Sequence, residues 1–146
     1  MAEISGSLEY YRDGENVVAI VIRREVQEKL SESKVFTPPD WKMQVGFSIH
    51  RSGHTVKPHV HSPAQPVKWD ARFEVLHVLK GKVRIYLYGK SGRRLGYTIL
   101  EPGDTIVMWC GHRVDFLEDS ILLEVKEGPY PGPDLDKIWI SVEKDQ

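Results

Sequence analysis

Two short apolar runs flank one glycine-rich turn in the stretch Val83-Arg84-Ile85-Tyr86-Leu87-Tyr88-Gly89-Lys90-Ser91-Gly92-Arg93-Arg94-Leu95-Gly96-Tyr97-Thr98-Ile99-Leu100. Both runs contain β-branched and aromatic residues, and turn-forming residues separate them, which is the pattern of paired β-strands. We therefore expect a hairpin in which the turn at residues 89–92 joins a strand at 83–88 to a strand at 95–100.

The rest of the chain follows the same pattern, with apolar runs interrupted about every ten residues by Gly, Pro, Asp or Asn. Asp13-Gly14 is a turn pair that tolerates positive φ, and it predicts a second hairpin between residues 8–11 and 17–22. Further strands are expected at residues 43–50, 74–79, 105–109, 112–117, 121–126 and 137–142. The sequence thus predicts an all-β sandwich or barrel.

Few segments favour anything other than strands. Residues 25–33 have helix-forming composition, and Pro38-Pro39 would end a helix there, so we expect at most one short helix. The longest irregular stretch, residues 62–71, contains Pro63 and Pro66 and cannot be a central strand. Loops of this length in small domains are often functional.

Size and charge limit the function. A chain of 146 residues matches one ordinary domain, so we expect a single domain over residues 1–146. Its 20 basic and 21 acidic residues give a formal net charge of -1, without the broad positive field that nucleic-acid or anionic-membrane binding needs. We expect small-molecule partners, no nucleic acid and no membrane.

Cys110 is the single cysteine, so the chain can form neither an internal disulfide nor a cysteine-based zinc cluster. The first residues have neither the basic start nor the apolar run of a signal peptide, and no apolar stretch approaches the length of a membrane span. These features favour a cytoplasmic protein.

Histidines cluster in the segment Gly53-His54-Thr55-Val56-Lys57-Pro58-His59-Val60-His61. In a strand, side chains two apart share a face, so His59 and His61 would point the same way. Neutral imidazole is the commonest protein ligand for zinc, iron, copper and nickel. Glu74 begins an apolar strand, where a carboxylate is costly unless a cation or donor compensates, and His112 opens another strand. The sequence predicts a metal site.

The spacing of Gly53, His59, His61, Glu74 and Gly81 resembles the first motif of the cupin superfamily. The segment Leu100-Glu101-Pro102-Gly103-Asp104, followed by His112, looks like its second motif. The resemblance implies a double-stranded β-helix, or jelly-roll, barrel that holds one divalent metal ion through His59, His61, Glu74 and His112. Twelve residues separate His61 from Glu74, more than the family usually has, and Met108-Trp109-Cys110-Gly111 replaces its usual Pro-x-Gly.

The resemblance covers about residues 43–126, which would form the barrel core. An N-terminal hairpin at about 7–24 would precede this core, and a tail with one strand at 127–146 would follow it. Barrels of this family commonly pair through their sheets, so we expect a homodimer. The hairpin at residues 8–22, with Tyr10 and Tyr11, is the expected contact surface.

Three imidazoles and one carboxylate would leave a divalent ion, iron, manganese, nickel or zinc, with a formal charge of about +1. We expect a metal-dependent enzyme, of the isomerase/epimerase or dioxygenase type, acting on a small polar or sugar-derived substrate. The alternatives are a barrel that binds or senses a small sugar-like ligand without turning it over, and a metal that only stabilises the fold. No catalytic residue can be named.

Other polar residues near these motifs have simpler interpretations. His54 precedes the ligand pair on a loop, and His77 alternates away from Glu74 on its strand. Cys110 is expected to be a small buried apolar residue. Glu124 alternates with Leu122 and either gives the interior a second carboxylate or faces solvent.

Overall fold

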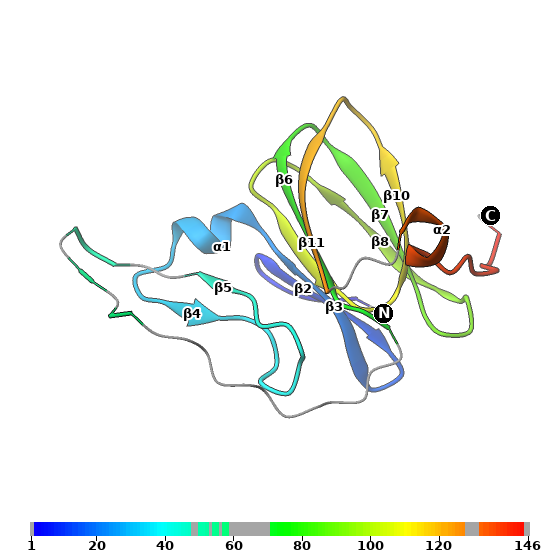
Figure 1. Ribbon diagram of the computed structural model, residues 1–146, viewed down its shortest axis with the longest axis horizontal. Helices are drawn as coiled ribbons and strands as arrows, with labels where there is room; N and C mark the ends of the chain where they lie inside the picture. Colours follow the sequence, from blue (N-terminus) through cyan, green and yellow to red (C-terminus); the bar gives the residue numbers. More distant parts are fainter. Residues whose placement is uncertain are drawn as a thin grey trace.

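The computed structural model describes residues 2–47, 50–52, 54–55, 57–58, 71–127 and 132–144. These residues are mostly β-structure in antiparallel sheets (Figure 1). The strands are β1 Ala2–Ser5, β2 Leu8–Asp13, β3 Asn16–Ile22, β4 Lys34–Val35, β5 Gly46–Phe47, β6 Glu74–Lys80, β7 Val83–Tyr88, β8 Arg94–Leu100, β9 Thr105–Met108, β10 Gly111–Phe116 and β11 Ile121–Lys126. The helices are α1 Arg24–Glu28 and α2 Pro133–Asp136.

The strands form a six-stranded sheet in the order β1-β2-β3-β9-β6-β11 and a three-stranded sheet in the order β10-β7-β8. Strands β4 and β5 form a small separate pair that extends away from the two sheets (Figure 1). Both predicted hairpins are confirmed: Tyr86 of β7 lies opposite Tyr97 of β8, and Leu8 of β2 lies opposite Ile22 of β3. The all-β prediction is therefore confirmed, although the described strands do not close into one continuous sheet.

The two sheets share one hydrophobic core. Alternate residues Leu76 and Val78 of β6 are buried, and so are alternate residues Val83, Ile85 and Leu87 of β7. Because successive side chains of a strand point to opposite faces, these residues define the inner face of each sheet. The space between the inner faces is the interior of the molecule.

Several predicted boundaries are wrong. The helix expected at 25–33 is the five-residue α1, which buries no side chain, and α2 is a second helix that begins at Pro133. The strand expected at 43–50 is limited to Gly46–Phe47 among the described residues. Neither helix has the length and apolar character needed to cross a membrane, as far as the described residues go.

Residues 137–142 do not form the expected strand, because they join no ladder. Ile138 and Trp139 are 88% and 87% exposed, so the packing that usually turns strand propensity into a strand is missing. The segment is attached at its end, where the amide of Glu143 donates to the carbonyl oxygen of Gly92 at 3.1 Å.

A polar network anchors the end of β3. The guanidinium of Arg23 donates to Glu9 of β2 (2.9 Å from Nε), to Thr98 Oγ1 of β8 (2.8 Å) and to Asp104 (3.0 Å). Asp104 also accepts from the backbone amides of Arg24 and Glu101, at 3.0 and 2.9 Å. Asp104 of the second sequence motif therefore links the loop between β8 and β9 to Arg23 and Arg24 at the end of β3.

Gly81, the last residue of the first sequence motif, forms the turn between β6 and β7 with φ +89°. A Cβ atom here would collide with the side chain of Ser120 and the carbonyl oxygen of Asp119. We expect Gly81→Ala to lower the free energy of unfolding by about 1–3 kcal/mol, measured by urea denaturation. Gly14→Ala is the control, because Gly14 also has positive φ but no atom near its Cβ position. Equal losses in the two variants would contradict the steric explanation.

Candidate functional site

The structure brings two of the four predicted metal ligands together. Oε2 of Glu74, at the start of β6, lies 3.1 Å from Nε2 of His112, near the start of β10. The two strands belong to different sheets, so the pair bridges the two sheets. A carboxylate and an imidazole from distant parts of the sequence thus meet at one point.

Strand alternation explains why both side chains point inward. Glu74 shares the face of β6 that carries the buried Leu76 and Val78. His112 lies opposite the buried Leu87 in the β10–β7 ladder, and opposite residues of a ladder share a face. The side chain of Glu74 is 14% exposed and that of His112 is 29% exposed, so the pair lies at the margin of the interior.

A backbone carbonyl orients the His112 ring. Nδ1 of His112 lies 3.1 Å from the carbonyl oxygen of Cys110. A carbonyl oxygen can only accept a hydrogen bond, so Nδ1 must carry a hydrogen and donate it. Nε2 is then the nitrogen that faces Glu74. Histidines that bind metal are usually fixed through their other ring nitrogen in this way.

Each partner changes the protonation of the other. Burial alone would lower the pKa of His112, but the hydrogen bond and negative charge of Glu74 outweigh burial and raise the pKa above its usual value. Burial alone would raise the pKa of Glu74, but the hydrogen bond and positive charge of His112 lower it. Each partner therefore favours the charged form of the other.

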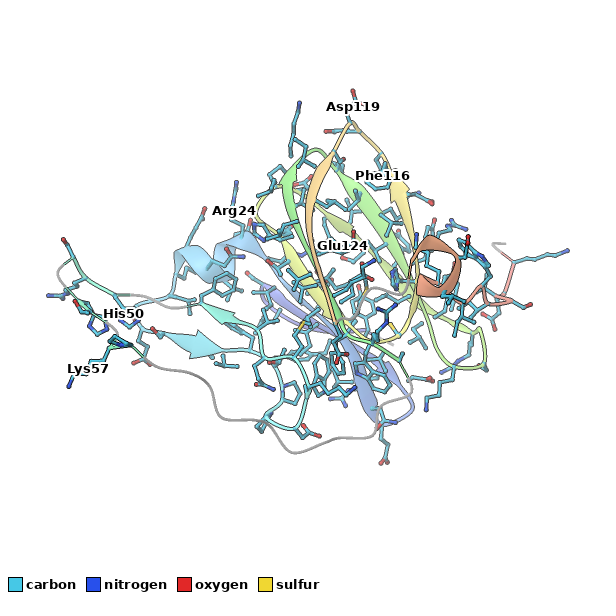
Figure 2. All side chains as sticks on the ribbon, in the orientation of Figure 1. Arg24, His50, Lys57, Phe116, Asp119 and Glu124 are labelled. Atoms are coloured by element: carbon cyan, nitrogen blue, oxygen red, sulfur yellow. The ribbon has the colours of Figure 1, made fainter. Side chains whose placement is uncertain are left out.

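Charged side chains of β11 complete the inner face. Lys126 lies opposite Glu74 in the β11–β6 ladder, and Glu124 lies opposite the buried Leu76, so both belong to the inner face. Nζ of Lys126 lies 3.0 Å from Oε1 of Glu124, and both groups contribute to the lowered pKa of Glu74. Figure 2 labels Glu124 beside β11. The side chain of Glu124 is 49% exposed, so its carboxylate is open to solvent although it lies beside Glu74.

Sequence reasoning missed two lysines. Lys126 follows Glu124 by two residues, so the two side chains share a face of the strand. The alternation that placed Glu124 could therefore also have placed Lys126. Lys137 affects the pKa of His112, which it lowers, but it belongs to the segment that was wrongly expected to be a strand. No local pattern in the sequence places Lys137 next to β10.

His59 and His61 lie outside the described residues, and so does Gly53. The described residues that precede them lie away from the sheets: His50 and Lys57 are at the far end of the extension that contains β4 and β5 (Figure 2). The rings of His50 and His54 stack there, with centroids 4.1 Å apart and planes 3° apart. Within the described ranges, no three His, Cys, Asp or Glu side chains form a group that could hold a metal ion.

The distance between Glu74 and His112 suits a shared metal ion. Bonds from an ion to imidazole nitrogen or carboxylate oxygen are about 2.1 Å, so two ligands at a right angle lie about 3.0 Å apart, and tetrahedral ligands about 3.4 Å apart. The observed separation is 3.1 Å. It also suits the direct hydrogen bond of the ion pair. One ion could therefore replace the shared proton with little movement of either strand.

Cys110 is expected to be chemically inert in the folded protein. Burial raises the pKa of its thiol to about 12, and only a thiolate attacks alkylating reagents at a useful rate. We expect iodoacetamide at pH 8 to label native protein more than about a hundredfold slower than urea-unfolded protein, as measured by mass spectrometry. Rapid labelling of the native protein would show that the thiol is accessible and ionised.

Comparison of the chain with protein-family models, with curated proteins and with solved structures finds no match.

Proposed function

We propose that this chain is a metal-dependent enzyme with a cupin-like jelly-roll barrel. One divalent ion, iron, manganese, nickel or zinc, would bind to His59, His61, Glu74 and His112. The observation that carries the proposal is the contact between Glu74 and His112 at 3.1 Å, because two predicted ligands from different sheets meet on the inner faces.

Two further features support the proposal. Two antiparallel sheets around one core are what a jelly roll would contain, and β6 and β10 contribute ligands from opposite sheets. The carbonyl oxygen of Cys110 holds His112 in the tautomer that leaves Nε2 available to an ion. The proposal requires the chain after Lys57 to return to the sheets with His59 and His61.

A bound ion would act as a Lewis acid that polarises a carbonyl or enolate oxygen, or as a site for dioxygen if the ion is iron. The chain's own residues have distinct tasks beside it. Glu74 contributes negative charge, Cys110 orients His112, and Glu124 supplies a carboxylate next to Glu74. These groups fit an isomerase, epimerase or dioxygenase of a small polar substrate.

A second candidate function is a barrel that binds a small ligand without turning it over. The observation that favours it concerns Glu124, whose carboxylate already pairs with Lys126 at 3.0 Å. A general acid or base must be able to reach the substrate, and an ion pair of this kind competes with that contact. Assays of oxygen uptake and of sugar isomerisation by metal-loaded protein separate the two candidates.

Metal analysis tests the proposed site directly. We expect protein purified without added metal and without a polyhistidine tag to contain about one equivalent of a transition metal per chain, by elemental analysis. Dialysis against a chelator should remove the ion and lower the melting temperature, because a ligand that binds only the folded state stabilises it. Wild-type protein that contains no metal, and takes up none when it is supplied, would rule the site out.

We propose that the protein is cytoplasmic and that it forms a homodimer. Sedimentation at micromolar concentration tests the dimer. Tyr11 cannot belong to the dimer surface expected at residues 8–22, because it is 3% exposed and belongs to the core. Strand β1 also pairs with one edge of β2. Tyr10 is partly buried against the same core.

A further inference from the structure

A cavity of about 620 Å³ lies between the start of α1 and the loop that joins β8 to β9. Its volume falls within the range of about 300–1,000 Å³ that is usual for small-molecule sites. The residues that line it include Ser7 from the turn after β1, Arg24 and Glu25 from α1, and Glu101 and Pro102 from the loop after β8. The described residues of the proposed metal site are not among them, so this is a separate place in the fold.

Contacts between α1 and the loop hold the walls of the cavity in place. Nε2 of Gln27 donates to the carbonyl oxygen of Gly103 at 2.8 Å, and the backbone amide of Arg24 donates to Asp104 at 3.0 Å. The stem of Arg24 packs so closely on Gly103 that a Cβ atom there would lie 2.7 Å from Cδ of Arg24. A ligand would therefore meet a preformed wall, which lowers the entropy cost of binding.

The buried guanidinium beneath the cavity has no capacity left for a ligand. All five N–H groups of the Arg23 guanidinium donate hydrogen bonds, to Glu9, Thr98, Asp104 and the carbonyl oxygen of Ile99. A bound anion would have to displace one of these partners. The charged groups that can recognise a ligand must therefore lie at the rim.

Two charged groups at the rim keep bonding capacity. Arg24, labelled in Figure 2, pairs with Glu28 through Nε at 3.3 Å, and its guanidinium has no other partner among the described residues. The exposed carboxylate of Glu25 has no ion pair or hydrogen bond in the described part of the chain. Lys82 and Glu101, which also line the cavity, pair with each other at 3.3 Å. The rim thus offers one positive and one negative group.

We propose that this cavity binds a free α-amino acid with an aliphatic side chain. The terminal nitrogens Nη1 and Nη2 of Arg24 bind its carboxylate, because two parallel N–H groups suit the two carboxylate oxygens. Glu25 binds its ammonium. An α-amino acid carries both charged groups on one carbon atom, which suits receptor groups on adjacent residues. Its apolar side chain lies against Ile99. The inference goes beyond the proposed function and does not depend on a metal ion.

Titration of isotope-labelled protein with L-leucine, followed by NMR, tests both affinity and location. Two analogues each lack one charged group: isocaproate lacks the ammonium, and isoamylamine lacks the carboxylate. We expect leucine to bind at least about tenfold more tightly than either analogue, because each loses one charge-assisted contact. Leucine should shift the backbone amide signals of Gly6 and Glu101, which line the cavity.

Arg24→Met and Glu25→Gln should each weaken leucine binding about tenfold or more. Both residues are exposed, so both variants are expected to fold. Arg24→Met should bind leucine no better than isoamylamine, and Glu25→Gln should bind it no better than isocaproate. This loss of discrimination assigns each ligand group to its residue, as in a double-mutant cycle.

Lys29→Met and Glu32→Gln are the matched controls, because they remove the same charges from exposed residues that do not line the cavity. Both should bind leucine as the wild type does. The inference is overturned if leucine does not bind, if the analogues bind as tightly, or if the Arg24 and Glu25 variants keep the wild-type affinity. Leucine-induced shifts confined to Glu74 and His112 would also overturn it, since the amino acid would then occupy the proposed metal site.

Discussion

Replacing Arg23 with methionine is expected to lower the free energy of unfolding by about 3–5 kcal/mol, measured by urea denaturation. Methionine keeps much of the packing volume but removes the charge that faces Glu9 and Asp104. Those carboxylates are 12% and 9% exposed, so each would remain in a poorly solvated place without its cation. The carbonyl oxygen of Ile99, which accepts from Arg23 at 2.6 Å, would also lose its donor.

Arg24→Met is the matched control for this prediction. Arg24 is the next residue, but its side chain is 56% exposed and pairs with Glu28 of the same helix at 3.3 Å. Exposed pairs of this kind contribute at most about 0.5 kcal/mol. Similar losses in the two variants would mean that the buried network contributes no more than a surface pair.

Replacing either His59 or Glu74 with alanine is expected to weaken metal binding more than about a hundredfold, measured by competition with a chelating dye. Replacing a residue that only orients a metal ligand costs about 10–100-fold in metal affinity, and replacing a direct ligand costs more. His59→Ala is the more informative variant, because Glu74 is already placed by its contact with His112, whereas His59 is assigned by motif alone.

His54→Ala is the control, since His54 stacks on His50 at the far end of the β4–β5 extension. Its metal affinity should equal that of the wild type. If His59→Ala keeps the full metal affinity, His59 is not a ligand. Glu74 and His112 would then either bind no metal or belong to a different ligand set. Loss of metal affinity in His54→Ala would indicate that the metal binds on the β4–β5 extension instead.

Local signals explain which parts of the fold were predictable. The turns at Asp13-Gly14 and at residues 89–92 each determine a hairpin within a few residues, and both hairpins are confirmed. The network of Arg23 with Glu9, Thr98 and Asp104 joins residues far apart in the sequence, and no local pattern announces it. The tail after α2 has strand composition, but residues 137–142 join no ladder and Ile138 and Trp139 are almost fully exposed, so strand propensity alone misled the prediction.

The candidate site, like the fold, was predictable only where a local sequence signal exists. Motif spacing in the sequence selects Glu74 and His112, and the structure places Oε2 of Glu74 3.1 Å from Nε2 of His112. Metal binding by these residues stays a prediction. Lys126 depends on which residue of β11 faces Glu74, and strand register is set by pairing rather than by sequence. The position of Lys137 near His112 depends on where the tail lies after α2, which composition cannot indicate.

The group that orients the His112 ring is the backbone carbonyl oxygen of Cys110. Replacing the side chain of Cys110 therefore leaves this acceptor oxygen in place. Alanine scanning would therefore classify position 110 as a packing position and overlook its part in the site. Exchanging the amide that links residues 110 and 111 for an ester, by chemical synthesis, would weaken that oxygen as an acceptor while keeping every side chain.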